Sequence, residues 1–104
     1  TTSASITYGQ VISGLTGGKH FVVDVSRNGA GPASGNEWCN PGGRSLGATP
    51  TTNTGYGLVD ALLWVKRPGE SDGTCNGGPA SGKWFADWAL NTATNTGFLL
   101  AYAG

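Results

Sequence analysis

GLVDALLWVKRPGESDGTC, residues 57–75, joins an apolar run to a cluster of charged side chains. Its leucine, valine and tryptophan residues are typical of a buried strand, and we expect one over residues 58–65. A second run of β-branched and aromatic residues, HFVVDV, predicts another strand over residues 20–25. Both runs are apolar at successive positions, which is typical of parallel strands that are covered on both faces.

Two other segments have helical spacing. The apolar residues of SITYGQVISGLT predict a helix over residues 5–16, which the two following glycines would end. Ser81 can cap a second helix over residues 81–94, where Trp84 and Trp88 lie one turn apart and are expected in the core. The closing segment GFLLAYAG fits either a further strand or an apolar tail.

The order helix, strand, long loop, strand, helix is typical of an α/β barrel or a doubly wound sheet. A complete barrel takes about 250 residues, whereas this chain has 104. Two strands alone would also leave the edges of a sheet unpaired. We therefore expect residues 1–104 to form a single segment of a larger α/β domain.

Composition excludes several classes of function. The formal net charge is zero and only 12% of the residues are charged, so no basic surface is expected to bind nucleic acid. No apolar run approaches the roughly 18 residues of a membrane span, and the first residues lack the pattern of a signal peptide. The cysteines and the single histidine have no metal-binding spacing, and we expect neither a metal nor a cofactor.

Two cysteines, Cys39 and Cys75, lie in segments rich in glycine, asparagine and proline. A bridge between them would stabilise the fold by about 3–4 kcal/mol on the chain-entropy account. Such a bridge indicates an oxidising, extracytoplasmic location, and a reduced pair is the alternative.

Charged residues follow both predicted strands. The side chains just beyond the carboxyl ends of strands line the site in α/β folds, so Arg27, Lys66, Glu70 and Asp72 are expected at one rim. Carboxylates among cations can hydrogen-bond sugar hydroxyls or activate water, although the cations lower the pKa and weaken a base. The alternative is a solvated turn with incidental ion pairs, because PGESDG is also common turn chemistry.

The intervening loop, residues 26–56, is rich in Gly, Asn, Pro, Thr and Ser and lacks periodicity. Loops of this length inside a compact domain are usually functional. Trp38, in this loop, fits either a platform for a sugar ring or packing against a disulfide. Trp64 is expected in the core and His20 in a structural role.

Asp24 and Asp60 interrupt the two apolar runs that predict strands. A carboxylate buried in a strand must be paired or hydrogen-bonded. We therefore expect both to belong to polar networks, without a direct part in chemistry.

Four segments together resemble family six glycoside hydrolases: HFVVDVSRNGAGP, NEWCNPGGRSLG, LVDALLWVKRPGESDGTC and SGKWFADWAL. They occur in the family's order, and the resemblance runs from about Tyr8 to about Leu90. These enzymes are cellobiohydrolases and endoglucanases that cleave β-1,4-glucan with inversion. The resemblance implies the C-terminal part of a distorted (β/α) barrel in a secreted enzyme, with β-1,4-glucan or a cello-oligosaccharide as its partner.

The resemblance also implies roles for individual residues. Asp72 resembles the family's proposed catalytic base, with Arg27 and Lys66 in ion pairs around it. Glu70 and Lys66 resemble groups that hydrogen-bond glucosyl hydroxyls, and Trp38 resembles a platform under a sugar.

Cys39 and Cys75 match the cysteines that form a disulfide in this part of the family's barrel. The family's proton donor is an aspartate upstream of the segment that Tyr8 begins, so no residue here matches it. We therefore expect residues 1–104 alone to hydrolyse β-glucan poorly. The alternatives are a non-catalytic carbohydrate-binding module, or a chain that completes a barrel with the missing N-terminal part or with another chain.

Overall fold

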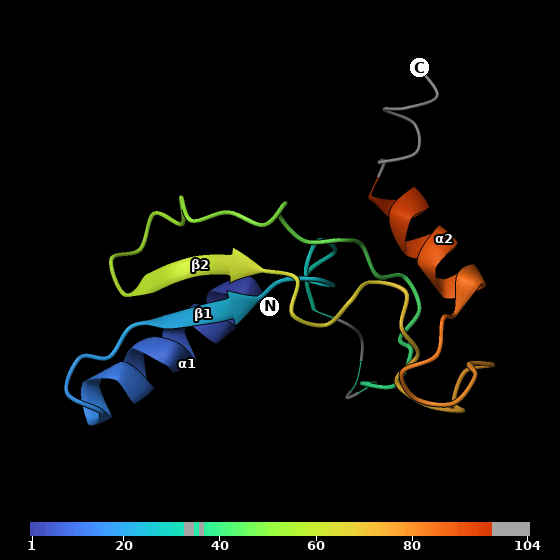
Figure 1. The fold of residues 1–104 in the computed structure, drawn as a ribbon, viewed down its shortest axis with the longest axis horizontal. Coiled ribbons are helices and arrows are strands. Elements are labelled where there is room, and N and C mark those ends of the chain that lie inside the picture. The colour runs from blue at the N-terminus through green and yellow to red at the C-terminus, as the bar shows by residue number, and fades with distance from the viewer. Residues whose placement is uncertain (33–34, 36, 97–104) are drawn as a thin grey trace, which may run out of the picture.

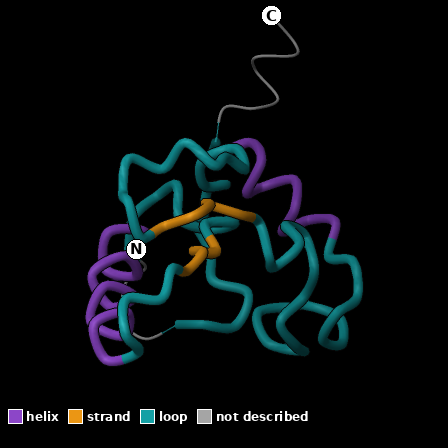
Figure 2. The backbone as a smooth tube through the Cα atoms, turned by 60° about the vertical axis from the view of Figure 1, so that its left-hand side comes forward, coloured by secondary structure: helices purple, strands orange, loops and turns teal. Residues whose placement is uncertain are grey.

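The fold contains two helices and two strands. The computed structural model describes residues 1–32, 35 and 37–96, so the closing GFLLAYAG lies outside the described residues. The elements are α1 (Thr2–Leu15), β1 (Phe21–Asp24), β2 (Val59–Leu63) and α2 (Ala86–Asn95). Both strands point toward the side on which α2 lies (Figure 1). The strand pair lies between the two helices (Figure 2). A short connection joins α1 to β1, and long loops join β1 to β2 and β2 to α2.

Helix α1 confirms the first predicted helix and begins three residues earlier than expected. The Thr1 hydroxyl accepts a hydrogen bond from the Ala4 N–H at 3.2 Å, which caps the first turn. Gly17 follows the helix with a φ of 77°, a conformation that glycine adopts without strain. None of the helices in the described residues is long and apolar enough to cross a membrane.

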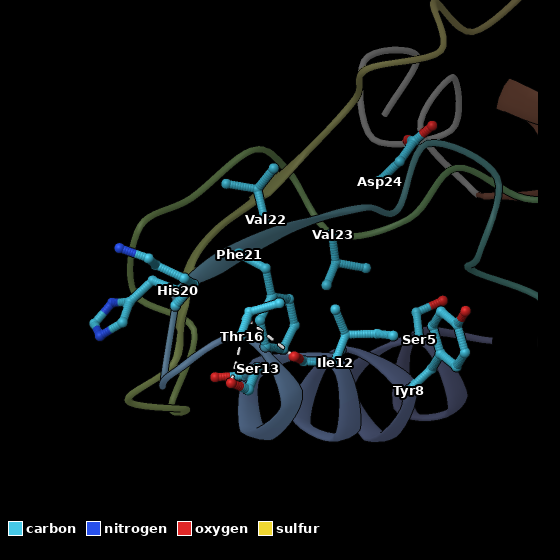
Figure 3. A pocket seen from close by; sticks show the side chains of 12 residues that line it. Ser5, Tyr8, Ile12, Ser13, Thr16, His20, Phe21, Val22, Val23 and Asp24 are labelled. Carbon is cyan, nitrogen blue, oxygen red and sulfur yellow. Dashed lines mark hydrogen bonds between the residues drawn. The ribbon is translucent and has the colours of Figure 1, made fainter.

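Helix α1 packs against β1 through a glycine. The Phe21 ring occupies the space that a side chain at Gly9 would need, so only glycine allows this close approach. Phe21 and Val23 point from β1 toward α1, whereas Val22 points away (Figure 3). The buried core consists of Ile6, Val23, Val25 and Val59, with Phe21, Leu62 and Trp64 packed against it.

The two strands pair in parallel, as the sequence predicts, with Val23 opposite Leu62. Within the described residues only one face of β1 is covered. Val22 is 50% exposed, because no element within the described residues covers that face of the two-stranded sheet.

The loop that joins the strands has ordered contacts but contains no helix or named strand among its described residues. Thr51 pairs with Leu62 through two backbone hydrogen bonds of 3.0 and 2.9 Å. The indole Nε1–H of Trp64 donates to the Ala48 carbonyl at 2.9 Å. The Trp64 ring is partly buried and packs against the core from outside, so the prediction that it is a core residue is wrong.

Helix α2 begins at Ala86, later than the sequence predicts. The preceding backbone forms a short antiparallel ladder instead: Ser71 N–H donates to the Lys83 carbonyl, and Phe85 N–H donates to the Gly69 carbonyl, both at 2.8 Å. This pairing keeps the chain extended up to Phe85, so the intrinsic helical spacing of the segment is overridden.

The two tryptophans of this segment have different environments. Trp88 is 8% exposed, which confirms the prediction that it is a core residue. Trp84 is 65% exposed, so the same prediction is wrong for Trp84. Ser81 does not cap the helix, because α2 starts five residues further along and Phe85 occupies the cap position.

Candidate active site

The carboxyl ends of the two strands are tied together by Asp24. Its Oδ1 accepts the Ser26 N–H at 3.0 Å, and its Oδ2 accepts the Lys66 N–H at 3.1 Å. This places Arg27, which follows β1, close to Lys66, which follows β2. The prediction that Asp24 belongs to a polar network is therefore confirmed.

Asp72 lies between the two cations at this rim. Its Oδ2 is 2.7 Å from Arg27 Nη1, and its Oδ1 is 3.2 Å from Lys66 Nζ. A third donor, the Asn40 N–H, reaches Oδ2 at 2.9 Å. The Asp72 side chain is only 10% exposed, whereas those of Arg27 and Lys66 are 24% and 25% exposed.

These contacts decide the charge of Asp72. Burial raises the pKa of the carboxyl, but the bonds from Arg27, the Asn40 N–H and Lys66 together outweigh burial and lower the pKa below its ordinary value. Asp72 is therefore ionised at neutral pH. A carboxylate with a lowered pKa is a weak proton acceptor but a persistent negative charge.

Arg27 is held from its other side by an aromatic ring. Its guanidinium carbon lies 5.5 Å from the centroid of the Trp88 ring, within the range of a cation–π contact. The Trp88 Nε1–H donates to the Pro41 carbonyl at 2.9 Å, which orients the ring. Trp88 thus connects α2 to the ion pair, a role that helical spacing alone does not indicate.

Asn40 is the site residue that sequence reasoning missed. Besides its backbone bond to the carboxylate, its Oδ1 accepts the Asp72 N–H at 2.8 Å. It has a φ of 48° and is 3% exposed. The one local signal is that asparagine tolerates positive φ better than most residues, but the sequence does not indicate which groups such a residue would bond.

The disulfide between Cys39 and Cys75 is confirmed, with the two Cα atoms 6.1 Å apart. It closes the turn that carries Asp72. Ser71, which is fully buried, fills the space beneath this turn and bonds the carbonyl of Pro79 at 2.7 Å. The candidate carboxylate is therefore set on a cross-linked loop.

Two predicted sugar-binding residues lie outside the ion-pair cluster. Glu70 contacts Arg67 at 3.4 Å and makes no ion pair with the cations around Asp72. Trp38 is 71% exposed, directly before the disulfide. This exposure favours the reading of Trp38 as a platform over the reading of a ring packed in the loop.

His20 and Asp60 form a separate pair at the opposite ends of the strands. His20 Nδ1 lies 2.7 Å from Asp60 Oδ1, and both side chains are more than half exposed. The pair connects the start of β1 to β2, which agrees with the predicted structural role of His20 and the predicted network role of Asp60.

Two of the hollows on the described surface are relevant to the site. One, of about 410 Å³, lies between α1 and β1 and is walled largely by apolar side chains such as Ile12 and Phe21 (Figure 3). The other, of about 570 Å³, is lined by Asn40 and Trp88 together with polar side chains of the disulfide loop and α2. The second hollow includes Asn40, which bonds Asp72 directly, whereas the first reaches the site only through Asp24.

Comparison with known proteins supports the resemblance. The sequence profile of Glycosyl hydrolases family 6 matches residues 2–96. The chain belongs to this family. Endoglucanase A of Cellulomonas fimi is 62% identical over 96 residues, which cover 91% of this chain and 21% of that enzyme. Endoglucanase A of Thermobispora bispora is 45% identical over 96 residues, covering 90% of this chain and 20% of that enzyme.

Solved structures of the family have the same fold in the matched region. The endoglucanase Cel6 of Mycobacterium tuberculosis, in complex with methyl-cellobiosyl-4-deoxy-4-thio-β-D-cellobioside, gives a TM-score of 0.86 at 56% identity over 91% of this chain and 33% of that chain. The catalytic core domain of the cellobiohydrolase Cel6A of Chaetomium thermophilum gives 0.75 at 33% identity, over 86% and 31%. The chain thus spans about a fifth of the length of its curated relatives and about a third of these solved chains.

Proposed function

We propose that this chain is the C-terminal part of the catalytic domain of a secreted β-1,4-glucan hydrolase, and that Asp72 lies on the base side of its cleft. The observation that carries the proposal is the ionised Asp72 carboxylate, held by Arg27 and Lys66 beyond the carboxyl ends of two parallel strands. Family membership supports the substrate, because the similar proteins are named endoglucanases and cellobiohydrolases. The disulfide supports secretion, because such bonds persist in oxidising compartments.

The geometry around Asp72 favours a role in orienting water. A carboxylate has about four acceptor positions, and three of them receive Arg27, Lys66 and the Asn40 N–H. The remaining position, on Oδ1, can accept a hydrogen bond from a water molecule. Asp72 would then hold the attacking water and stabilise positive charge developing on the sugar ring, while its lowered pKa limits it as a proton acceptor.

Two residues beside the cluster fit contacts with the glucan. The exposed Trp38 ring offers an apolar face against which a pyranose ring can stack. The Glu70 carboxylate and the Lys66 ammonium can hydrogen-bond sugar hydroxyls, each through donors or acceptors that are partly open to solvent. Together they would form glucosyl subsites next to the reacting bond.

An inverting mechanism also needs an acid across the scissile bond from the base, with room for water between them. We propose that a preceding part of a distorted (β/α) barrel supplies this acid. The exposed face around Val22 and the cavity between α1 and β1 would be covered by that part.

The second candidate is a non-catalytic chain that binds carbohydrate or only completes a barrel. Helices of 14 and 10 residues and a parallel strand pair count against a carbohydrate-binding module, which is usually an antiparallel sandwich. The alternative is then a chain that completes a barrel without taking part in catalysis. A protein that contains such a chain in place of a catalytic one would not cleave glucan.

The stereochemistry of the product tests the proposal. The complete polypeptide that contains residues 1–104 is mixed with a soluble cello-oligosaccharide, and proton NMR follows the anomeric signals of the new reducing ends. We expect the α-anomer to appear first, because inversion converts the β-linkage. First appearance of the β-anomer would contradict inversion, and binding without any cleavage would favour the non-catalytic candidate.

A further inference from the structure

Asn40 adopts a backbone conformation that few residues tolerate. Its φ of 48° lies in the left-handed region, where asparagine is several-fold enriched among non-glycine residues. The residue is 3% exposed and directly follows the disulfide cysteine Cys39. A buried polar residue in this conformation persists only when the surrounding contacts fix it.

The contacts that fix Asn40 go to Asp72 in both directions. The Asn40 N–H donates to Asp72 Oδ2 at 2.9 Å, and the Asp72 N–H donates to Asn40 Oδ1 at 2.8 Å. One bond holds the carboxylate and the other holds the backbone of the same residue. The position and the rotation of the Asp72 side chain are therefore both constrained by one neighbour.

The amide nitrogen of Asn40 fixes the turn on which Asp72 lies. Nδ2 is 2.9 Å from the Gly73 carbonyl and 3.0 Å from the Cys75 carbonyl, with the Ser71 hydroxyl a further neighbour at 3.2 Å. Both carbonyls belong to the turn that the disulfide closes. Asn40 therefore bonds the residues just after Asp72 as well as Asp72 itself.

We propose that Asn40 is a positioning residue that aims the Asp72 carboxylate at Arg27 and into the cleft. Its importance for hydrolysis rests on the function proposed above, whereas its control of the Asp72 carboxylate does not. The left-handed backbone turns the Asn40 N–H toward Oδ2, and the side chain keeps the Asp72 backbone from moving away. Loss of the side chain would let the carboxylate retreat from Arg27 toward solvent.

The chain offers a matched control in Asn76. Asn76 has a φ of 49°, lies beside the other cysteine of the same disulfide, and donates from Nδ2 to the Cys39 carbonyl at 2.9 Å. It therefore shares the residue type and the backbone conformation with Asn40, and it lies at the other end of the same disulfide, in the loop after β2. Its side-chain bond goes to the Cys39 carbonyl, which belongs to the same peptide unit as the Asn40 N–H, and not to Asp72 or its turn. The same substitution there therefore tests for loosening of that peptide while the Asn40 side chain is kept.

The experiment measures the pKa of Asp72 in the complete polypeptide by carbon-13 NMR of labelled aspartate, assigned with Asp72→Asn. Glycine keeps the backbone N–H and tolerates the positive φ, so Asn40→Gly removes only the side chain. We expect Asn40→Gly to raise the pKa of Asp72 toward that of a free aspartate and Asn76→Gly to raise it clearly less, because the side-chain bonds of Asn40 remain. An unchanged pKa in folded Asn40→Gly, or an equal rise in both variants, would overturn the proposal.

A titration of amide proton shifts in the unmodified protein tests the same proposal if the variants do not fold. If the Asn40 N–H bonds the carboxylate, its proton shift must titrate with the pKa of Asp72, whereas the Asn76 N–H must not. A flat titration at Asn40 would overturn the proposal without any substitution.

Kinetics separate this inference from the proposed function. With a soluble β-1,4-glucan, Asn40→Gly is expected to lower kcat by about 10- to 100-fold, with little change in KM, and Asn76→Gly to lower kcat less than Asn40→Gly does. If Asp72→Asn is as active as the unmodified protein, the proposed function falls while the pKa result still decides the role of Asn40. If Asp72→Asn is inactive but Asn40→Gly keeps full kcat, the positioning role in hydrolysis is overturned.

Discussion

Arg27 Nη1 lies 2.7 Å from Asp72 Oδ2, although 45 residues separate the two in the chain. The contact exists because Arg27 follows β1 and Asp72 belongs to the loop after β2, and parallel strands bring their carboxyl ends to the same edge. The Trp88 ring supports the guanidinium from the other side. The parallel strand pair therefore determines the position of the candidate catalytic carboxylate through this ion pair.

Removal of the Arg27 charge is expected to destabilise the fold. Arg27→Gln would leave the nearly buried Asp72 carboxylate without its shortest partner, at a cost of about 1.5–3 kcal/mol in the free energy of unfolding. Arg67→Gln is the control, because Arg67 is 85% exposed and its pair with Glu70 is worth less than about 1 kcal/mol. Chemical denaturation of both variants measures the difference, and equal losses would contradict the account.

The lowered pKa of Asp72 predicts how stability depends on pH. A lowered pKa means that the folded state favours the ionised form, so the stabilisation is fully present above the ordinary aspartate pKa of about 3.9. It is lost as the pH falls through the folded-state pKa of Asp72. The unfolding free energies of the unmodified protein and Asp72→Asn should therefore converge in acid. A difference that stays constant from neutral pH to about pH 2 would contradict this.

The exposed Trp38 ring is expected to bind sugar. Trp38→Ala should weaken the binding of a cello-oligosaccharide by about 2- to 10-fold, if stacking is worth about 0.5–1.5 kcal/mol. Trp38→Phe should retain much of the affinity because an aromatic face remains. Tyr56→Ala is the control, since Tyr56 is also exposed but precedes β2, at the other end of the strand. Titration calorimetry measures all three, and equal affinities for Trp38→Ala and Tyr56→Ala would argue against the platform.

The Cys39–Cys75 disulfide is expected to stabilise the turn that holds Asp72. The bond joins residues 36 apart in sequence, and its removal by a double Cys→Ser substitution should cost about 2–5 kcal/mol. Thermal unfolding with and without a reductant provides the measurement. A double variant whose melting temperature equals that of the oxidised protein would show that the hydrogen bonds of Asn40 hold the turn unaided.

Local patterns in the sequence were sufficient for much of the fold. The apolar runs at residues 20–25 and 58–65 predicted the parallel strands, because β-branched and aromatic residues are enriched in strands and continuous apolar runs are typical of parallel sheets. The start of α2 was not predictable in the same way. Trp84 and Phe85 have helical spacing, but backbone pairing with the Gly69–Ser71 segment, distant in sequence, overrides that local preference.

The candidate site also has features that could be predicted from the sequence and features that could not. Convergence of Arg27, Lys66 and Asp72 followed from the rule that the ends of parallel strands share an edge. The contribution of Asn40 could not be predicted, because its bonds depend on how the irregular loop before β2 folds back onto the turn after it. The exposure of Trp84 could not be predicted from helical spacing either, because α2 begins at Ala86 and Trp84 is not part of a helix.

The most direct test of the central claim is the rate at which the complete polypeptide releases reducing ends from a soluble β-1,4-glucan. We expect Asp72→Asn to lower kcat by about 100-fold or more, in line with loss of a preorganised charge that orients water and stabilises the transition state. Asp60→Asn should keep the rate within about twofold, because Asp60 pairs with His20 at the opposite end of the strands. An Asp72→Asn rate equal to that of Asp60→Asn would contradict the claim.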